Sequence, residues 1–148
     1  IYAAHRGHTE VVDALLASGA DPAIRNAGGN SALLAAAAAG RLGAVQVLLA
    51  HGAAPDVSTK HGTTPLLWAS QEGFADVVRV LVEAGASVDA QDGDGDSGLI
   101  VASKYGHEDV IDVLLAAGAD RTLVNRSGET ALSAAESAGG SGVVERLR

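Results

Sequence analysis

The chain has 148 residues and a formal net charge of −8 at pH 7, and 47% of its residues are hydrophobic although only 3% are aromatic. This length fits one domain with a core of Ala, Val and Leu, and the acidic balance argues against nucleic-acid binding, which needs a basic surface. The absence of cysteine excludes disulfides, thiolate zinc sites and a cysteine nucleophile, and there is no apolar run of about 18 residues to insert into a membrane.

Residues 1–25 hold the first two predicted helices, the second of which ends at Gly19. Their pattern returns every 33 residues along the chain, which is the signature of an internal repeat. Three sets of equivalent positions show it: Ala3, Ala36, Ala69, Ala102 and Ala135; Gly7, Gly40, Gly73, Gly106 and Gly139; Leu15, Leu48, Leu81, Leu114 and Leu147.

We therefore divide one predicted domain, residues 1–148, into five units. These are a partial repeat (1–25), three full repeats (26–58, 59–91 and 92–124) and a truncated repeat (125–148). Because both ends fall inside predicted helices, we expect the chain to be a piece of a longer protein.

The second repeat begins with a thin helix, in which Leu34 is followed by Ala35–Ala39. Alanine is the best helix former and projects little side chain. We therefore expect a low, nearly flat surface on this helix.

The third repeat shows how each unit is built. Thr64 is suited to cap a helix with its hydroxyl. Pro65 suits the first helical position, because a backbone N–H has no partner within the helix there and its absence in proline costs no hydrogen bond. Leu66–Glu72 should form two turns that end at Gly73. A second helix over about Ala75–Ala84 carries valine and leucine on one stripe. A polar, glycine-bearing loop then leads to the next repeat.

The fourth repeat follows the same plan, whereas Gly139, Gly140 and Gly142 weaken the fifth, whose end we expect to fray. Every predicted helix has only about 7–10 residues, and isolated helices shorter than about 12–15 residues are marginal in water. The units must therefore stack, so that each buries its apolar stripe against its neighbours.

The pattern Gly-x-Thr-Pro-Leu, then Ala, then Gly-His-x-x-Val-Val-x-x-Leu-Leu and Gly-Ala resembles the ankyrin repeat over the whole chain. The resemblance implies an all-α solenoid of stacked helix–turn–helix pairs with β-hairpin-like loops at one edge. The chain retains the proline of the family's Thr-Pro-Leu-His only at Pro65. The histidine of that motif is replaced by Ile1, Leu34, Leu67, Ile100 and Ser133. We expect apolar packing to replace the hydrogen bond that the family often builds between repeats with this histidine.

Ankyrin repeats bind proteins along a concave groove of loop tips and first helices, so the resemblance implies a protein or extended-peptide partner. The partner-binding residues expected on repeats three and four are Lys60, His61, Thr63, Trp68, Gln71, Glu72, Asp94, Asp96, Val101, Lys104 and Tyr105.

Trp68, the only tryptophan, stands one repeat after Ala35. We interpret it as one wall of a shallow apolar pocket with an alanine floor and with Tyr105 as a second wall. Burial in the core is the alternative, because tryptophan is usually mostly buried.

Acidic residues concentrate between positions 72 and 112. They favour a basic partner, with a Lys or Arg that meets Glu72, Asp94 and Asp96.

Two motifs in one loop resemble sites of other kinds. Gly93–Gly98 reads Gly-x-Gly-x-x-Gly, but a dinucleotide site needs a strand before it, and Gly95 repeats the glycine of every predicted loop. Asp92, Asp94 and Asp96 begin like a calcium loop, but its required glycine and bidentate glutamate are both serine here. Loose cation binding by these carboxylates is the alternative to a solvated turn. We expect no metal site, no cofactor and no catalytic residue.

These features together predict a non-catalytic, monomeric protein-interaction module. Two alternatives stay open: a regulatory or structural segment of a larger enzyme or channel, and a self-associating spacer whose open ends stack. The full-length sequence decides the first, and light scattering over a concentration range decides the second.

Overall fold

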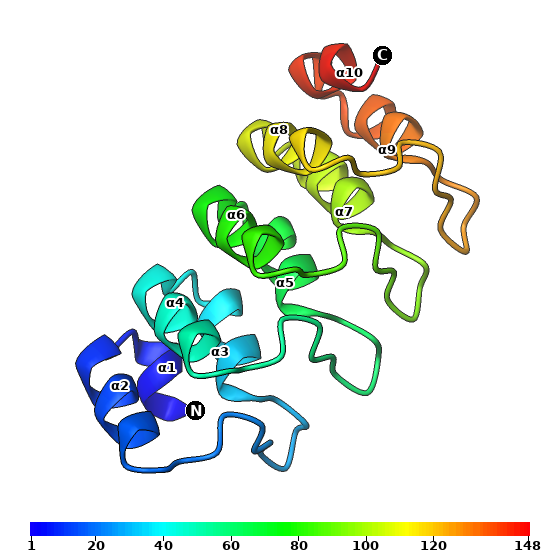
Figure 1. Cartoon of the computed structure of the whole chain (residues 1–148). Helices are drawn as coiled ribbons and strands as arrows, with labels where there is room; N and C mark the ends of the chain where they lie inside the picture. Colours follow the sequence, from blue (N-terminus) through cyan, green and yellow to red (C-terminus); the bar gives the residue numbers. More distant parts are fainter.

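The computed structural model describes residues 1–148 as ten helices without an extended strand. The helices form five pairs that stack one above another along a single solenoid (Figure 1). The pairs are α1 (Tyr2–Arg6) with α2 (Thr9–Ala17), α3 (Ala32–Ala38) with α4 (Leu42–Ala50), α5 (Pro65–Glu72) with α6 (Ala75–Glu83), α7 (Gly98–Tyr105) with α8 (Glu108–Ala116), and α9 (Ala131–Ala138) with α10 (Ser141–Leu147). This is the all-α repeat solenoid that the sequence predicts.

The predicted cap at Thr64 is present, and equivalent side chains cap the start of three other odd-numbered helices. The side-chain oxygen of Ser31 accepts a hydrogen bond from the N–H of Leu34 at 3.2 Å, and Thr64 accepts from Leu67 at 3.3 Å. Ser97 and Thr130 cap α7 and α9 in the same way. Each cap satisfies one of the backbone donors that a helix start leaves free.

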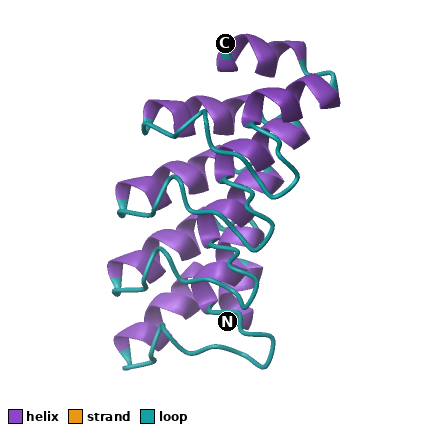
Figure 2. Cartoon of the chain, turned by 90° about the vertical axis from the view of Figure 1, so that its right-hand side faces the viewer, coloured by secondary structure: helices purple, strands orange, loops and turns teal.

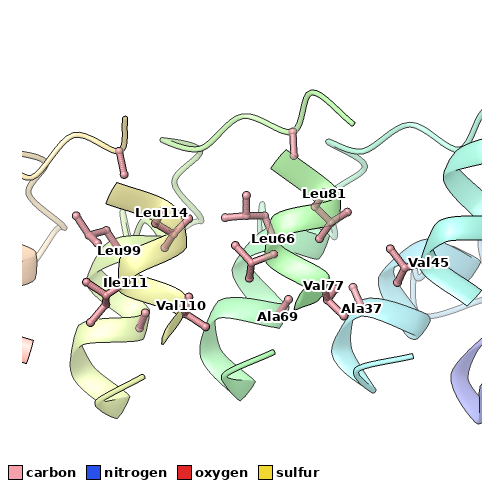
Figure 3. Packing of buried hydrophobic residues seen from close by; sticks show 14 of the residues in the cluster. Ala37, Val45, Leu66, Ala69, Val77, Leu81, Leu99, Val110, Ile111 and Leu114 are labelled. Atoms are coloured by element: carbon pink, nitrogen blue, oxygen red, sulfur yellow. The ribbon is translucent and has the colours of Figure 1, made fainter. Parts of the chain in front are cut away.

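The core is a continuous strip of small and branched aliphatic side chains between the two layers of helices. Figure 3 shows Leu66, Leu81, Leu99 and Leu114 within it, and all four are at most 1% exposed. Equivalent alanines on the odd-numbered helices are fully buried at Ala36, Ala69 and Ala102. Their small side chains leave room for neighbouring helices to approach, so that the short helices of adjacent repeats bury one another.

Apolar packing replaces the family's histidine in the second, third and fourth repeats, as expected, whereas Ile1 is exposed and Ser133 forms a capping box with Thr130. The substituting Leu34, Leu67 and Ile100 are 1–2% exposed. These side chains therefore contribute hydrophobic burial where the family often builds a hydrogen bond.

The loops between repeats are hairpin-like turns that project along one edge of the stack (Figure 2). In the loop before α7, Asp92 N–H donates to the Asp96 carbonyl at 3.1 Å. One isolated bridge, between Gln91 and Ser97, is the only β-type pairing. Each loop also contains a glycine at positive φ, such as Gly95 at 78°, a conformation that disfavours other residues.

The end of the fifth repeat is helical, and its expected fraying stays a prediction. Helix α10 is formed, and its Val143 and Leu147 are at most 5% exposed. Two of the three glycines lie outside helical segments, because Gly139 ends α9 at φ 74° and Gly140 precedes α10. Only Gly142 falls within the helix.

Candidate functional site

The odd-numbered helices and the loop tips form one continuous side of the stack, which we call the groove. Its loop segments are residues 26–30, 59–63, 92–96 and 125–129. Of the eleven predicted partner-binding residues, only Val101, the equivalent of Trp68 in the fourth repeat, is buried, at 7% exposure. The others lie on the groove, where they divide into separate clusters.

Trp68 lines a pocket of about 560 Å³ that reaches across three repeats. The lining of this Trp68 pocket consists of Ile1, Tyr2, His5, Asn26, Asn30, Leu34, Ala35, Ala38 and Trp68. The predicted alanine floor is present in α3, and the indole itself is half-buried. The pocket therefore offers an apolar base between two aromatic side chains.

The second wall is Tyr2 of α1, and Tyr105 is not part of the pocket. Tyr105 lies one repeat to the other side of Trp68 and stacks on His107 with ring centroids 6.2 Å apart. The repeat pattern of the sequence does indicate that Tyr2 forms this wall. Equivalent positions in three consecutive repeats read Tyr2, Ala35, Trp68, which places an alanine between two aromatic rings.

The rim of the Trp68 pocket keeps polar groups free. The Asn26 side-chain oxygen is used within its own loop, where it accepts from the N–H groups of Gly28 and Asn30 at 3.0 Å each. The His5 ring, the Asn30 amide and the Trp68 indole N–H make no hydrogen bond within the chain. The pocket thus combines an apolar floor with unused donors and acceptors at its edge, as binding pockets commonly do.

A second hollow lies at the loop tips of repeats three to five. This loop-tip hollow measures about 640 Å³ and has no hydrophobic lining residue. It brings together the predicted residues Lys60, His61, Thr63 and Asp94, and it adds Arg126. Two backbone bonds connect the three loops, from Gly93 N–H to the His61 carbonyl at 2.7 Å and from Arg126 N–H to the Asp94 carbonyl at 2.9 Å.

Lys104 is the centre of an ionic cluster at the C-terminal part of the groove. Its ammonium lies 2.9 Å from Asp96 and 3.3 Å from Glu129, and the Asn125 amide donates to the same two carboxylates at 2.7 and 3.0 Å. Partial burial disfavours the charged ammonium, but the bonds to Asp96 and Glu129 outweigh this effect and raise the pKa of Lys104. Hydrogen bonds from Asn125 and Lys104 lower the pKa of Glu129.

This cluster reduces the number of acidic side chains that are available to bind a basic residue of a partner. Asp96 is already paired with Lys104 and its side chain is only 16% exposed, so it does not await the basic partner residue that we expected it to meet. Asp94 and Glu72 remain exposed, and Glu72 accepts a hydrogen bond from the Gln71 amide at 3.2 Å.

The three clustered aspartates form a structured turn. The Asp92 carboxylate accepts from the N–H groups of Asp94 and Asp96 at 2.9 and 3.0 Å, and Thr59 and Asn125 build equivalent turns in their loops. No group of three or more His, Asp or Glu side chains is arranged to hold a metal ion. None of the helices has the length and hydropathy needed to span a bilayer.

Comparison with protein-family models matches residues 1–92 to a family described as "Ankyrin repeats (3 copies)". Residues 76–135 match a second model, "Ankyrin repeats (many copies)". A search of curated proteins finds no significant match.

Proposed function

The chain belongs to the ankyrin-repeat family, and from this premise we propose that it binds an extended segment of a partner protein in its groove. Domains of this family are generally non-catalytic and generally mediate protein–protein interactions. The finer assignment, to the groove and to a peptide of particular chemistry, rests on the Trp68 pocket.

The Trp68 pocket supports an apolar anchor residue on the partner. Tyr2 and Trp68 flank the alanines of α3, so a leucine or aromatic side chain would be enclosed on two sides and from below. Free hydrogen-bonding groups at the rim, on His5 and Asn30, suit the backbone of an extended peptide. Aromatic residues in such settings are frequent binding hot spots.

The exposed acidic residues of the groove indicate which type of partner residue should follow the apolar anchor. Glu72 follows Trp68 by one helical turn, and Asp94 lines the loop-tip hollow. Both are exposed and neither forms an ion pair within the chain, so a Lys or Arg placed after the apolar anchor has a free carboxylate to meet, with Glu72 favoured because Lys60 and Arg126 line the same hollow as Asp94. Asp96 is excluded from this role because Lys104 neutralises it.

The proposal is tested by selecting peptides from a displayed random library against the whole chain. Trp68 is the only tryptophan, so its fluorescence reports directly on the pocket. Selected peptides should share an apolar residue followed by a basic one, and they should shift Trp68 emission on binding. Trp68→Ala should weaken binding at least about 30-fold, the equivalent of ~2 kcal/mol, without loss of helicity.

Tyr105→Ala is the matched control, because Tyr105 is an aromatic residue in the groove that lies outside the pocket and is 61% exposed. It should leave the affinity within about threefold, since isolated exposed contacts contribute little. If Trp68→Ala binds the selected peptides as tightly as the unaltered chain does, the pocket is not the binding site. We further propose that the binding species is a monomer, which light scattering over a concentration range would verify.

A further inference from the structure

The C-terminal end of an odd-numbered helix receives a side-chain hydrogen bond from the following repeat at two of the junctions between repeats. Arg41 Nε donates to the His5 carbonyl at 3.1 Å, and His107 Nε2 donates to the Gln71 carbonyl at 2.8 Å. In both pairs the donor stands 36 residues after the acceptor. Because the last carbonyls of a helix have no partner within it, these side chains satisfy groups that the helix leaves free.

Phe74 takes the same position at the junction of repeats two and three, but it has no donor. A Cβ added to Gly40 would lie 2.8 Å from the Phe74 ring, just as one added to Gly73 would lie 2.7 Å from the His107 ring. Both rings therefore lie over the glycine that follows the preceding odd-numbered helix. The residue 36 before Phe74 is Ala38, and no backbone or side-chain donor of the chain bonds the Ala38 carbonyl.

This open carbonyl belongs to the Trp68 pocket and has a second acceptor beside it. Ala38 is partly exposed and lines the pocket. It is the last residue of α3, and Glu72 is the last residue of α5, which packs beside α3. The Glu72 carboxylate is exposed, and its only hydrogen bond comes from the neighbouring Gln71 amide at 3.2 Å. Two acceptors that lack a donor thus occupy the same end of adjacent helices.

From this arrangement we propose that the Ala38 carbonyl and the Glu72 carboxylate together bind the Lys or Arg side chain that follows the apolar anchor of the partner. The inference rests on the proposed function and specifies where the basic residue of the partner binds. Lysine carries three donors and arginine five, and neither carries an acceptor, so one basic side chain can bond both groups. Hydrogen bonds that involve a charged group are about twice as strong as neutral ones.

The other acceptors of the groove suit a basic residue less well. Asp94 shares the loop-tip hollow with Lys60 and Arg126, whose positive charges oppose a further cation. The Lys104 carbonyl has no side-chain donor either, because Gly140 stands 36 residues after it, but the Lys104 ammonium repels a basic residue there. The open carbonyl of Ala38 therefore places the basic residue at the helix-end side of the groove, away from the loop tips.

The test uses peptides selected from the displayed library, each paired with a synthetic copy in which the basic residue is glutamine. Trp68 fluorescence titrations at pH 8, where histidine is mostly neutral, give the ratio of the two affinities. The unaltered chain should bind the basic peptide at least about tenfold more tightly. Phe74→His supplies the missing donor to the Ala38 carbonyl and should reduce this preference to about threefold or less.

Phe74→Leu is the matched control, because it changes the same ring without adding a donor. It should keep the preference within about twofold of that of the unaltered chain. Both variants should bind the glutamine peptide as the unaltered chain does, since the Trp68 pocket is retained, and circular dichroism should show unchanged helicity. Glu72→Gln, at an exposed position, tests the second acceptor without touching the packing and should also lower the preference.

An unchanged preference in Phe74→His, or an equal loss in Phe74→His and Phe74→Leu, would overturn the inference. So would a preference that Asp94→Asn removes and Glu72→Gln leaves intact, because the basic residue would then bind at the loop tips. In each of these cases the peptides still shift Trp68 emission, and the proposed function stands. Selected peptides that lack a basic residue, or that leave Trp68 emission unchanged, would overturn the proposed function and this inference with it.

Discussion

Leu81 and Leu15 occupy equivalent positions in the third and first repeats but differ in burial. Leu81 is 0% exposed and Leu15 is 53% exposed. Leu81→Ala removes a side chain from a closed interior and leaves a cavity, which should cost about 3 kcal/mol of unfolding free energy. Leu15→Ala removes surface that is already half in water, and solvent fills the space, so the cost should be about 1 kcal/mol.

Urea unfolding followed by circular dichroism measures this difference of about 2 kcal/mol. The slope of the free energy with urea should be the same in both variants, since the surface exposed on unfolding barely changes, and only the midpoint should move. Equal losses from the two substitutions would refute the reasoning. They would show that Leu15 is covered in solution and that position in the stack does not govern burial.

Four further substitutions test the core and the ionic cluster. Ser70 has a fully buried hydroxyl without a hydrogen-bond partner. Ser70→Ala should therefore leave the free energy of unfolding unchanged or raise it by up to about 1 kcal/mol, and the melting temperature should stay the same or rise accordingly. Ser103→Ala, at the equivalent position, removes a 2.7 Å hydrogen bond from the Ser103 hydroxyl to a backbone carbonyl and should lower the free energy of unfolding by about 1 kcal/mol. A larger loss of stability in Ser70→Ala than in Ser103→Ala would contradict this reasoning. In Gly98→Ala the new Cβ would lie 2.8 Å from a buried leucine of α5, and thermal unfolding should show a loss of about 1–2 kcal/mol from overpacking. Lys104→Met should lower the free energy of unfolding by about 1 kcal/mol at pH 7; the loss is small because solvent screens the ion pairs of Lys104 with Asp96 and Glu129. Hydrogen bonds from Asn125 and Lys104 lower the pKa of Glu129, so the stabilisation that Glu129 contributes is present above its unfolded pKa of about 4.3 and is lost as the pH falls through its lower folded pKa. The urea midpoints of wild type and Lys104→Met should therefore converge in acid. A difference between the two midpoints that does not change with pH would show that the Lys104–Glu129 pair does not cause the loss of stability.

The repeat period and the local signals could be read from the sequence because they act over a few residues. A hydroxyl caps the helix that follows it, as Ser31 and Thr64 do, and a glycine ends the helix before it, as Gly73 does. The need for stacking followed from helix length alone. The burial of Leu34 and Leu67 was also predictable, since apolar residues stood where the family has a histidine.

The groove was less predictable because it depends on which side chains of different repeats meet. The alanine floor beside Trp68 was correctly placed, but the second wall came from Tyr2 and not from Tyr105. Tyr2, Ala35 and Trp68 occupy equivalent positions in consecutive repeats, so the repeat pattern places Tyr2 beside the alanine floor. Tyr105 occupies a different position of the repeat, equivalent to Glu72, and therefore does not face this floor.

By itself the sequence determined the period, the caps, the stacked helix pairs and the membership of these residues in a repeat family. Only the tertiary structure decided that Lys104 neutralises Asp96 and that the two ends of the stack differ, with Leu15 open at one and Arg148 paired at the other. Local signals act through bonds between near neighbours in the chain, and they recur identically in each repeat. Ion pairs and end surfaces depend on side chains brought together from different repeats, so they are specified by the assembled stack.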